Sequence, residues 1–164
     1  MTIATTLDFE LDGYNFQAQR LDAFKQLHLS RKLAPLLPPL APLIVRAAQT
    51  GVAGNVLELA ELAEPFALAL AQMKDDDAES VLTMTLLSVR VQTDAQKNVW
   101  MPLWVAGAKQ AAVVELNDLA RLLPIALRVI NYNLGNFIGG LLTNRAEEAS
   151  PETTGAPSRA ARTG

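Results

Sequence analysis

The first apolar pattern in the chain has the period of a β-strand and predicts a hairpin. Apolar and polar residues alternate over residues 7–11 and again over residues 14–18, with Asp12 and Gly13 between the two runs. An Asp-Gly pair in this position is a strong signal for a two-residue turn. We therefore expect two short antiparallel strands near the start of the chain.

The pattern then changes to the helical period. Asp22 is a residue type that caps helix N-termini, and the apolar residues after it recur at a spacing that predicts one buried face. The residues of that face are Leu21, Phe24, Leu27 and Leu33. Pro35 removes a backbone donor and disfavours helix just before it, and Pro38 and Pro39 favour an extended segment. We therefore expect a short helix that runs into a proline-rich apolar turn, the elbow (residues 34–39).

The rest of the chain carries further helix signals and a second strand pattern. Asn55 is expected to cap a helix over residues 56–73 that is kinked or divided at Pro65, and Pro124 is expected to open a last long helix through Leu142. The remaining elements are a short helix after Pro42, a helix over about residues 78–89 whose start is favoured by the charges of Asp75, Asp76 and Asp77, and a second hairpin over residues 99–105 and 111–114. Together they predict an α+β fold, a mainly α-helical single domain with two small β-hairpins.

The composition changes after Leu142. Residues 143–164 are rich in Ser, Thr, Pro, Ala and Gly and contain no aromatic or large aliphatic residue. They cannot bury enough apolar surface to offset the entropy lost on ordering. We expect a folded domain over residues 1–142 and a disordered C-terminal tail over residues 143–164.

Composition limits the classes of partner. Of the 164 residues 19% are charged and the net charge is −3, which leaves no strong electrostatic footprint for nucleic acid. The chain has no cysteine, no basic and apolar leader at its start, and no uncharged run that is both long and apolar enough to cross a bilayer. We therefore expect a cytosolic protein with neither a nucleic acid nor a membrane as partner.

Charge is nevertheless unevenly distributed along the chain. Residues 20–46 carry five cations against Asp22 alone, a net charge of +4, and residues 55–79 carry seven carboxylates against Lys74, a net charge of −6. The two segments could face each other. The alternatives are solvated helix faces with weak surface pairs, or a complementary patch for self-association or for steering a partner.

Residue types that support catalysis or metal binding are sparse. His28 is the only histidine and no nucleophile stands in a recognisable motif with it, so we expect it to pack half-buried with one nitrogen hydrogen-bonded. The run of three aspartates lacks the spaced ligands and turn glycine of a calcium loop. Gly135, Gly139 and Gly140 do not form a phosphate loop and are expected to permit close helix packing or to end the helix. No catalytic, cofactor-binding or metal site is expected.

Three stretches in two parts of the chain carry a resemblance to a known family. Residues 9–16 fit the pattern F-x-L-x-G-x-x-F, and residues 21–37 fit L-x-A-F-x-Q-x-H-x-x-R-K-L-A-P-x-L. Residues 128–137 are similar to an ending V-x-x-x-N-L-G-D-F, except that Asn136 stands where an aspartate is commoner. In these blocks the chain resembles the tail assembly chaperones of long-tailed bacteriophages and prophages.

The resemblance implies a role in virion morphogenesis without catalysis. Chaperones of this family coat the helical tape measure protein in the host cytoplasm, keep it soluble and help bring tail tube subunits to it, without remaining in the particle. The implied partners are the tape measure protein, the tail tube protein and further copies of the chain. Two alternatives stay open: a virion structural component, such as a tail completion or baseplate protein, and a small enzyme, which the sparse chemistry disfavours.

A chaperone for a long helical client needs accessible apolar surface with a polar rim, and the region of the elbow is the best source of it. Five aliphatic residues crowd nine positions there, more than one short segment easily points inward, and three cations flank them. We expect at least two of the five to be exposed in the monomer. The candidate partner-binding residues are Leu36, Leu37, Leu40, Leu43, Ile44, Arg31, Lys32 and Arg46.

Overall fold

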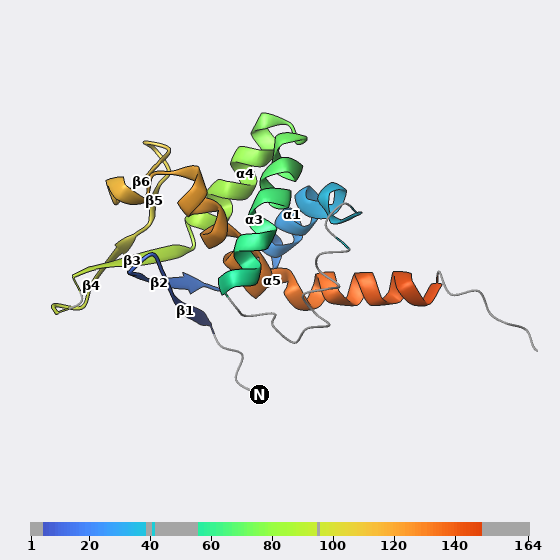
Figure 1. Ribbon diagram of the computed structural model, residues 1–164, viewed down its shortest axis with the longest axis horizontal. Coiled ribbons are helices and arrows are strands. Elements are labelled where there is room, and N and C mark those ends of the chain that lie inside the picture. Colours follow the sequence, from blue (N-terminus) through green and yellow to red (C-terminus); the bar gives the residue numbers. More distant parts are fainter. Residues whose placement is uncertain (1–4, 39–40, 42–55, 95, 149–164) are drawn as a thin grey trace, which may run out of the picture.

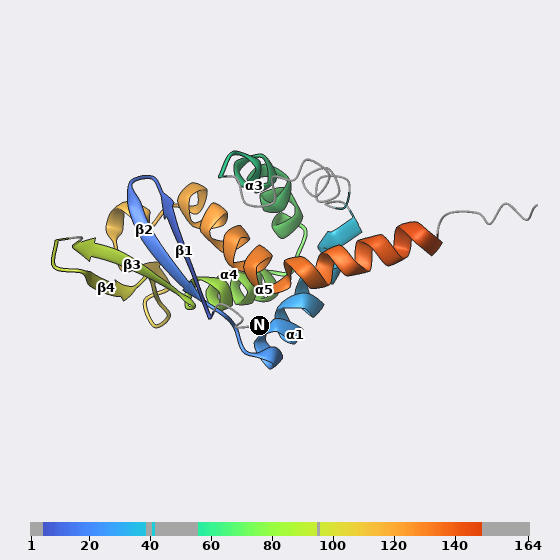
Figure 2. The same cartoon turned by 90° about the horizontal axis from the view of Figure 1, so that it is seen from below.

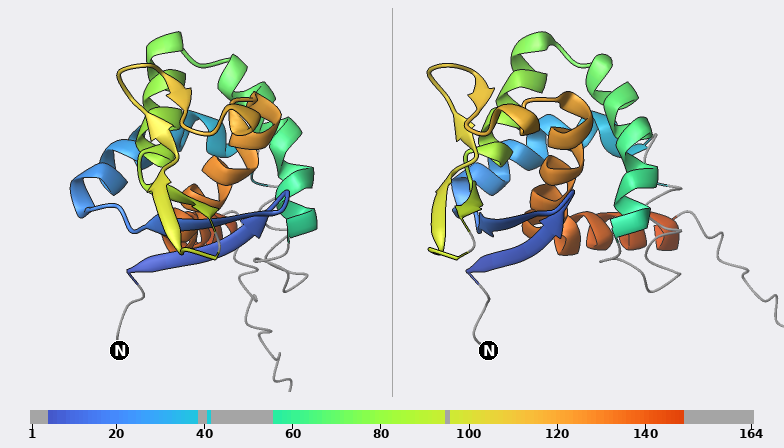
Figure 3. Two further views of the ribbon diagram at one scale, coloured as in Figure 1. Left: turned by 90° about the vertical axis from the view of Figure 1, so that its left-hand side faces the viewer. Right: turned by 60° about the vertical axis from the view of Figure 1, so that its left-hand side comes forward.

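The computed structural model describes residues 5–38, 41, 56–94 and 96–148. This part of the chain combines helices with two small antiparallel sheets, so the predicted α+β class is confirmed. Figure 1 shows the order of the elements along the chain, and Figure 3 shows the helices gathered on one side of the larger sheet. The predicted short helix after Pro42 and residues 149–164 of the predicted tail lie outside the described residues, whereas residues 143–148 are helical and not part of a disordered tail.

The larger sheet has four strands in the order β1-β2-β3-β4. They are β1 (Thr6–Leu11), β2 (Tyr14–Gln19), β3 (Val89–Asp94) and β4 (Val99–Pro102). The first hairpin is confirmed, with Asp12 and Gly13 at φ 52° and 81° in its turn. A two-residue turn that matches the twist of a hairpin needs positive φ at both central residues, which is why Asp-Gly occurs there.

The second predicted hairpin is correct only in part. β5 (Trp104–Val105) pairs with β6 (Gln110–Ala111) to form the two-stranded sheet, but β4 pairs with β3 instead. β3 was missed because the helix before it was expected to reach about Val89. Val89 and Val91 alternate with polar residues and are buried, so this segment has the period of a strand.

The main helices are α1 (Ala23–Leu33), α3 (Val56–Ala71), α4 (Asp75–Leu86) and α5 (Leu119–Glu148), with short 3₁₀ turns η1 (Ala34–Leu36) and η2 (Val114–Leu116). Helix α4 has three aspartates in its first turn, as expected from the helix dipole. Several helix bounds and interiors differ from the prediction. Helix α3 is continuous through Pro65, and α5 starts before Pro124 and continues past Leu142 to Glu148.

The elbow is helical where an extended segment was expected. Pro35 lies in the first turn of η1, and Leu37 and Pro38 are helical. Backbone N–H groups in the first turn of a helix have no acceptor within the helix, so proline, which lacks an N–H, fits there. Closely spaced prolines can therefore begin new turns without forcing the chain into an extended form. Pro39 lies outside the described residues.

Helix α5 joins the two halves of the core. Its residues Ile125 and Val129 pack with Phe16 of β2 and the other inward residues of the sheet. Its residues Ile130 and Leu134 pack in a second cluster with α1, α3 and α4. Figure 2 shows α5 crossing the molecule from the sheet and extending beyond the other elements at its C-terminal end.

The glycines of α5 neither end the helix nor share one role. A Cβ placed at Gly135 would lie 2.8 Å from Oδ1 of Asn131, one turn earlier in α5, so the crowding there is within the helix and not between helices. A Cβ at Gly139 or Gly140 would meet no described atom within 4 Å. The expectation of close helix packing is therefore wrong for these two positions.

Candidate partner-binding surface

Helix α1 has apolar side chains on two opposite faces. Leu29 and Leu33, four residues apart, are buried against the helices. Phe24 is 76% exposed and Leu27 is 53% exposed, so the prediction that these two residues belong to the buried face is wrong. At 3.6 residues per turn, Phe24 and Leu27 point away from the face that carries Leu29 and Leu33, and Arg31 lies beside them. We call Phe24, Leu27, His28 and Arg31 the outer face of α1.

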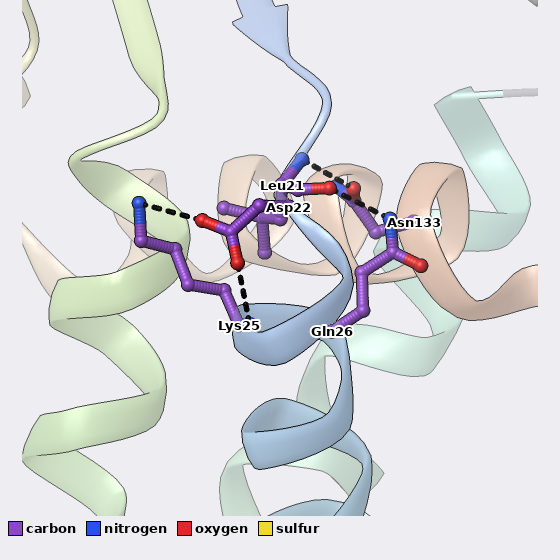
Figure 4. A network of polar contacts seen from close by, with 5 residues as sticks. All are labelled: Leu21, Asp22, Lys25, Gln26 and Asn133. Carbon is purple, nitrogen blue, oxygen red and sulfur yellow. Dashed lines mark hydrogen bonds and ion pairs between the residues drawn. The ribbon is translucent and has the colours of Figure 1, made fainter.

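A polar network fixes the start of α1 against α5 (Figure 4). The Asp22 side chain accepts a hydrogen bond from the Lys25 backbone N–H at 2.9 Å, which confirms the predicted cap and lowers the pKa of Asp22. The buried Asn133 accepts a hydrogen bond from the Leu21 backbone N–H at 2.8 Å, and Gln26 donates to the Leu21 carbonyl oxygen at 2.7 Å. Both backbone groups of Leu21 are therefore satisfied, and α1 is held in one orientation.

The sequence blocks that carry the resemblance meet in space through α5. Besides the bond from Leu21 to Asn133, the Arg128 guanidinium lies over the ring of Phe9 at 5.0 Å, and Arg20 lies over the ring of Tyr132 at 5.8 Å. Burial lowers the pKa of Arg128. The blocks at residues 9–37 and at residues 128–137 therefore pack together as one structural unit, which positions α1.

A groove of about 550 Å³ adjoins the outer face of α1. It lies between α1 with η1 on one side and the junction of α3 and α4 on the other. Its lining residues are His28, Arg31, Lys32, Pro35, Leu36, Gln72, Met73, Lys74 and Asp77. Apolar groups from Pro35, Leu36 and Met73 are thus surrounded by cationic side chains.

One ion pair connects α1 and α4 at the groove. Nζ of Lys32 donates to Oδ1 of Asp77 at 2.5 Å, and this hydrogen bond lowers the pKa of Asp77. The basic and acidic segments therefore face each other at this pair, as the charge pattern suggested. Elsewhere on α4, Glu79 pairs with Lys109 and raises its pKa.

Two cations of the groove form no close ion pair within the described part of the chain, although Lys74 helps to lower the pKa of Asp77. Arg31 and Lys74 are exposed and form no ion pair with any residue placed there. The nearby carboxylates of Asp22 and Asp77 are each engaged by a lysine. The groove therefore presents positive charge next to apolar surface.

The predicted partner-binding residues are only partly brought together. Leu36 is buried and Leu37 is half-buried. Arg31 is exposed, and Lys32 forms an ion pair with Asp77. The positions that lie outside the described residues are Leu40, Leu43, Ile44 and Arg46. The exposure of two or more of the five aliphatic residues stays a prediction.

Sequence reasoning missed four contributors to this surface, which are Phe24, Leu27, Met73 and Lys74. The expectation for His28 was also wrong, because its side chain is exposed at the groove and not half-buried. The sequence does contain a signal for the buried face of this helix, because Leu29 and Leu33 are four positions apart. This pair is an alternative to Phe24 and Leu27 as the apolar face.

The described residues offer neither a metal-binding cluster nor a membrane-spanning helix. They contain no group of three or more His, Cys, Asp or Glu side chains placed to hold a metal ion. Among the same residues, no helix has the length and apolar character needed to cross a membrane.

Comparison with known proteins gives a family match. Residues 12–143, which are 132 of the 164 residues, match a family described as phage tail assembly chaperone protein, TAC. No curated protein and no solved structure matches the chain.

Proposed function

The chain belongs to the phage tail assembly chaperone family, and from this premise we propose that it binds the tape measure protein and assists assembly of the tail tube around it. It acts by binding, without catalysis, in the cytoplasm of the bacterial host. Its further partners are the tail tube protein and other copies of the chain. The family match carries this proposal, since it covers most of the chain.

The surface of α1 supports a binding role. A chaperone for a helical client must expose apolar groups when it is free, surrounded by polar groups that keep it soluble. Phe24 and Leu27 are exposed on a helix whose other face is already buried, and Arg31 lies next to them. The elbow and the residues after it supply the remaining candidates.

Co-expression with the tape measure protein of the same phage tests the proposal. The chain should hold that protein in the soluble fraction and co-purify with it, and the purified tail should not contain the chain by mass spectrometry. Retention of the chain in finished particles would favour a structural component of the virion. Absence of any complex with the tape measure protein would refute the proposal.

The elbow is tested separately. Changing Leu40 and Leu43 to Ser should leave circular dichroism and melting little changed while co-purification is lost. If the double variant unfolds, these leucines belong to the core and contribute nothing accessible to the client.

A further inference from the structure

We propose that the outer face of α1 and the adjoining groove bind an amphipathic helix that carries carboxylates beside its apolar stripe. This inference rests on the proposed function and deepens it, because it assigns one surface and one chemistry to the client. It uses residues on α1 and at the junction of α3 and α4, and not the positions after the elbow.

The apolar part of the surface is suited to a helix. Phe24 and Leu27 lie three positions apart in the sequence, so their side chains lie side by side along α1. The groove next to them continues the apolar contact through Pro35 and Met73. A helix laid across a surface of this kind inserts residues spaced by three and four positions. Phe24 is aromatic and 76% exposed, and aromatic side chains contribute strongly to interfaces because they bury a large area.

The charges decide what kind of helix fits. The groove lining carries three Lys or Arg side chains (Arg31, Lys32 and Lys74) against the single carboxylate of Asp77. Arg31 forms no ion pair in the part of the chain that the structure describes. Asp77 is bonded to Lys32, and Lys74 also lowers its pKa, so this one carboxylate serves two of the three cations. An excess of positive charge beside apolar groups selects an occupant with carboxylates, since opposite charges across an interface fix partner choice and register.

A second copy docked through the same face is the main competing occupant, and charge argues against it. The groove beside this face is lined by three Lys or Arg side chains and one carboxylate, a net formal charge of +2. A symmetric dimer would place this face against itself. Two such faces would repel, and like charges brought together disfavour a pairing. An acidic client helix meets no such repulsion.

The test measures the dissociation constant between the full-length chain and the tape measure protein of the same phage. We expect Phe24→Ser with Leu27→Ser to weaken binding by about tenfold or more, because truncated apolar anchors dominate such interfaces. Val114→Ser is the matched control, since Val114 is 83% exposed on η2, and it should bind like the unmodified chain. Circular dichroism should be unchanged in both.

A charge variant tests the same surface without substituting an apolar residue. Arg31→Glu with Lys74→Glu should weaken binding by about tenfold at about 0.1 M salt, and the difference from the unmodified chain should shrink near 1 M salt, where the Debye length falls to about 3 Å. Lys97→Glu, at an exposed position in the β3–β4 turn, is the control.

The outcomes separate this inference from the proposed function. If the unmodified chain binds no tape measure protein, the proposed function fails. If it binds and both surface variants bind equally well, or Val114→Ser is equally harmful, the docking site lies elsewhere and the inference is overturned. If the charge variant binds as well as the unmodified chain, the occupant is not acidic. If the apolar variant instead dissociates a dimer without changing client affinity, the face pairs copies of the chain and the inference is wrong.

Discussion

Asn133→Leu tests how the start of α1 is held against α5. Oδ1 of Asn133 accepts the hydrogen bond from the Leu21 N–H at 2.8 Å, and its Nδ2 donates to the Val129 carbonyl oxygen at 2.8 Å. Asn133 and Leu21 are both buried. Leucine is similar in size but offers no acceptor, so the Leu21 N–H would stay buried without a partner.

The expected loss follows from the cost of that unsatisfied donor. Leaving a buried N–H without an acceptor lowers the free energy of unfolding by about 1–3 kcal/mol. For a domain of this size each kcal/mol corresponds to about 2–4 °C in Tm, so a loss of about 2 kcal/mol predicts a fall of roughly 4–8 °C. Thermal unfolding followed by circular dichroism measures this, and the Leu21 amide should exchange its hydrogen faster in the variant.

Asn136→Leu is the matched control, because Asn136 is an exposed asparagine on the same helix. Its Tm should change little, since exposed substitutions usually alter stability by less than about 0.5 kcal/mol. If Asn133→Leu is as stable as the unmodified chain, the bond to Leu21 does not hold α1. An equal fall in both variants would assign the effect to the change of residue type in α5, and would also refute the reasoning.

Three further predictions concern other parts of the chain. His28→Gln should change the free energy of unfolding by less than about 0.5 kcal/mol, because the side chain is exposed, and a larger loss in a denaturant titration would show a packing role. The hydrogen bond from Lys32 lowers the pKa of Asp77, so the pair stabilises the fold above the unfolded carboxyl pKa of about 4 and this contribution is lost as pH falls through the folded value. Lys32→Met should raise the pKa of Asp77 toward its ordinary value in a carboxyl NMR titration, and an unshifted value would contradict the pairing. A chain that ends at Glu148 should keep the Tm of the full chain, because the composition of residues 149–164 provides nothing to bury, and a clear fall on truncation would contradict this.

Local signals predicted the first hairpin and the cap of α1. Asp12 and Gly13 determine their turn through the backbone angles that they tolerate, and Asp22 caps through a bond to a residue three positions away. Neither depends on distant parts of the chain, so both could be read from short windows. The α+β class followed from the sum of such windows.

The outer face of α1 could not be read in this way. Leu29 and Leu33 form one apolar pair and Phe24 and Leu27 form another, on opposite sides of a helix only eleven residues long. Periodicity alone allows either side to face the core. Packing against α4 and α5 selects Leu29 and Leu33, and this information lies in residues distant in sequence.

The groove and β3 were missed for the same reason. Lys32 and Asp77 are 45 residues apart, and their meeting depends on the orientation of α1 that Asn133 imposes. The strand β3 pairs with β2, more than 70 residues earlier in the chain. A short apolar alternation directly after a helix carries too little local signal to separate it from the end of that helix.

The last turns of α5 separate the other helices and the sheets from any group that is attached after Glu148. Figure 1 shows this end of the helix pointing away from the sheet and from the other helices. From Gly135 to Glu148 the rise is about 20 Å, at 1.5 Å per residue. A following segment would need about six fully extended residues to return over that distance, at about 3.3 Å each. The end of α5 is therefore a favourable attachment point for a tag or reporter that must not cover α1.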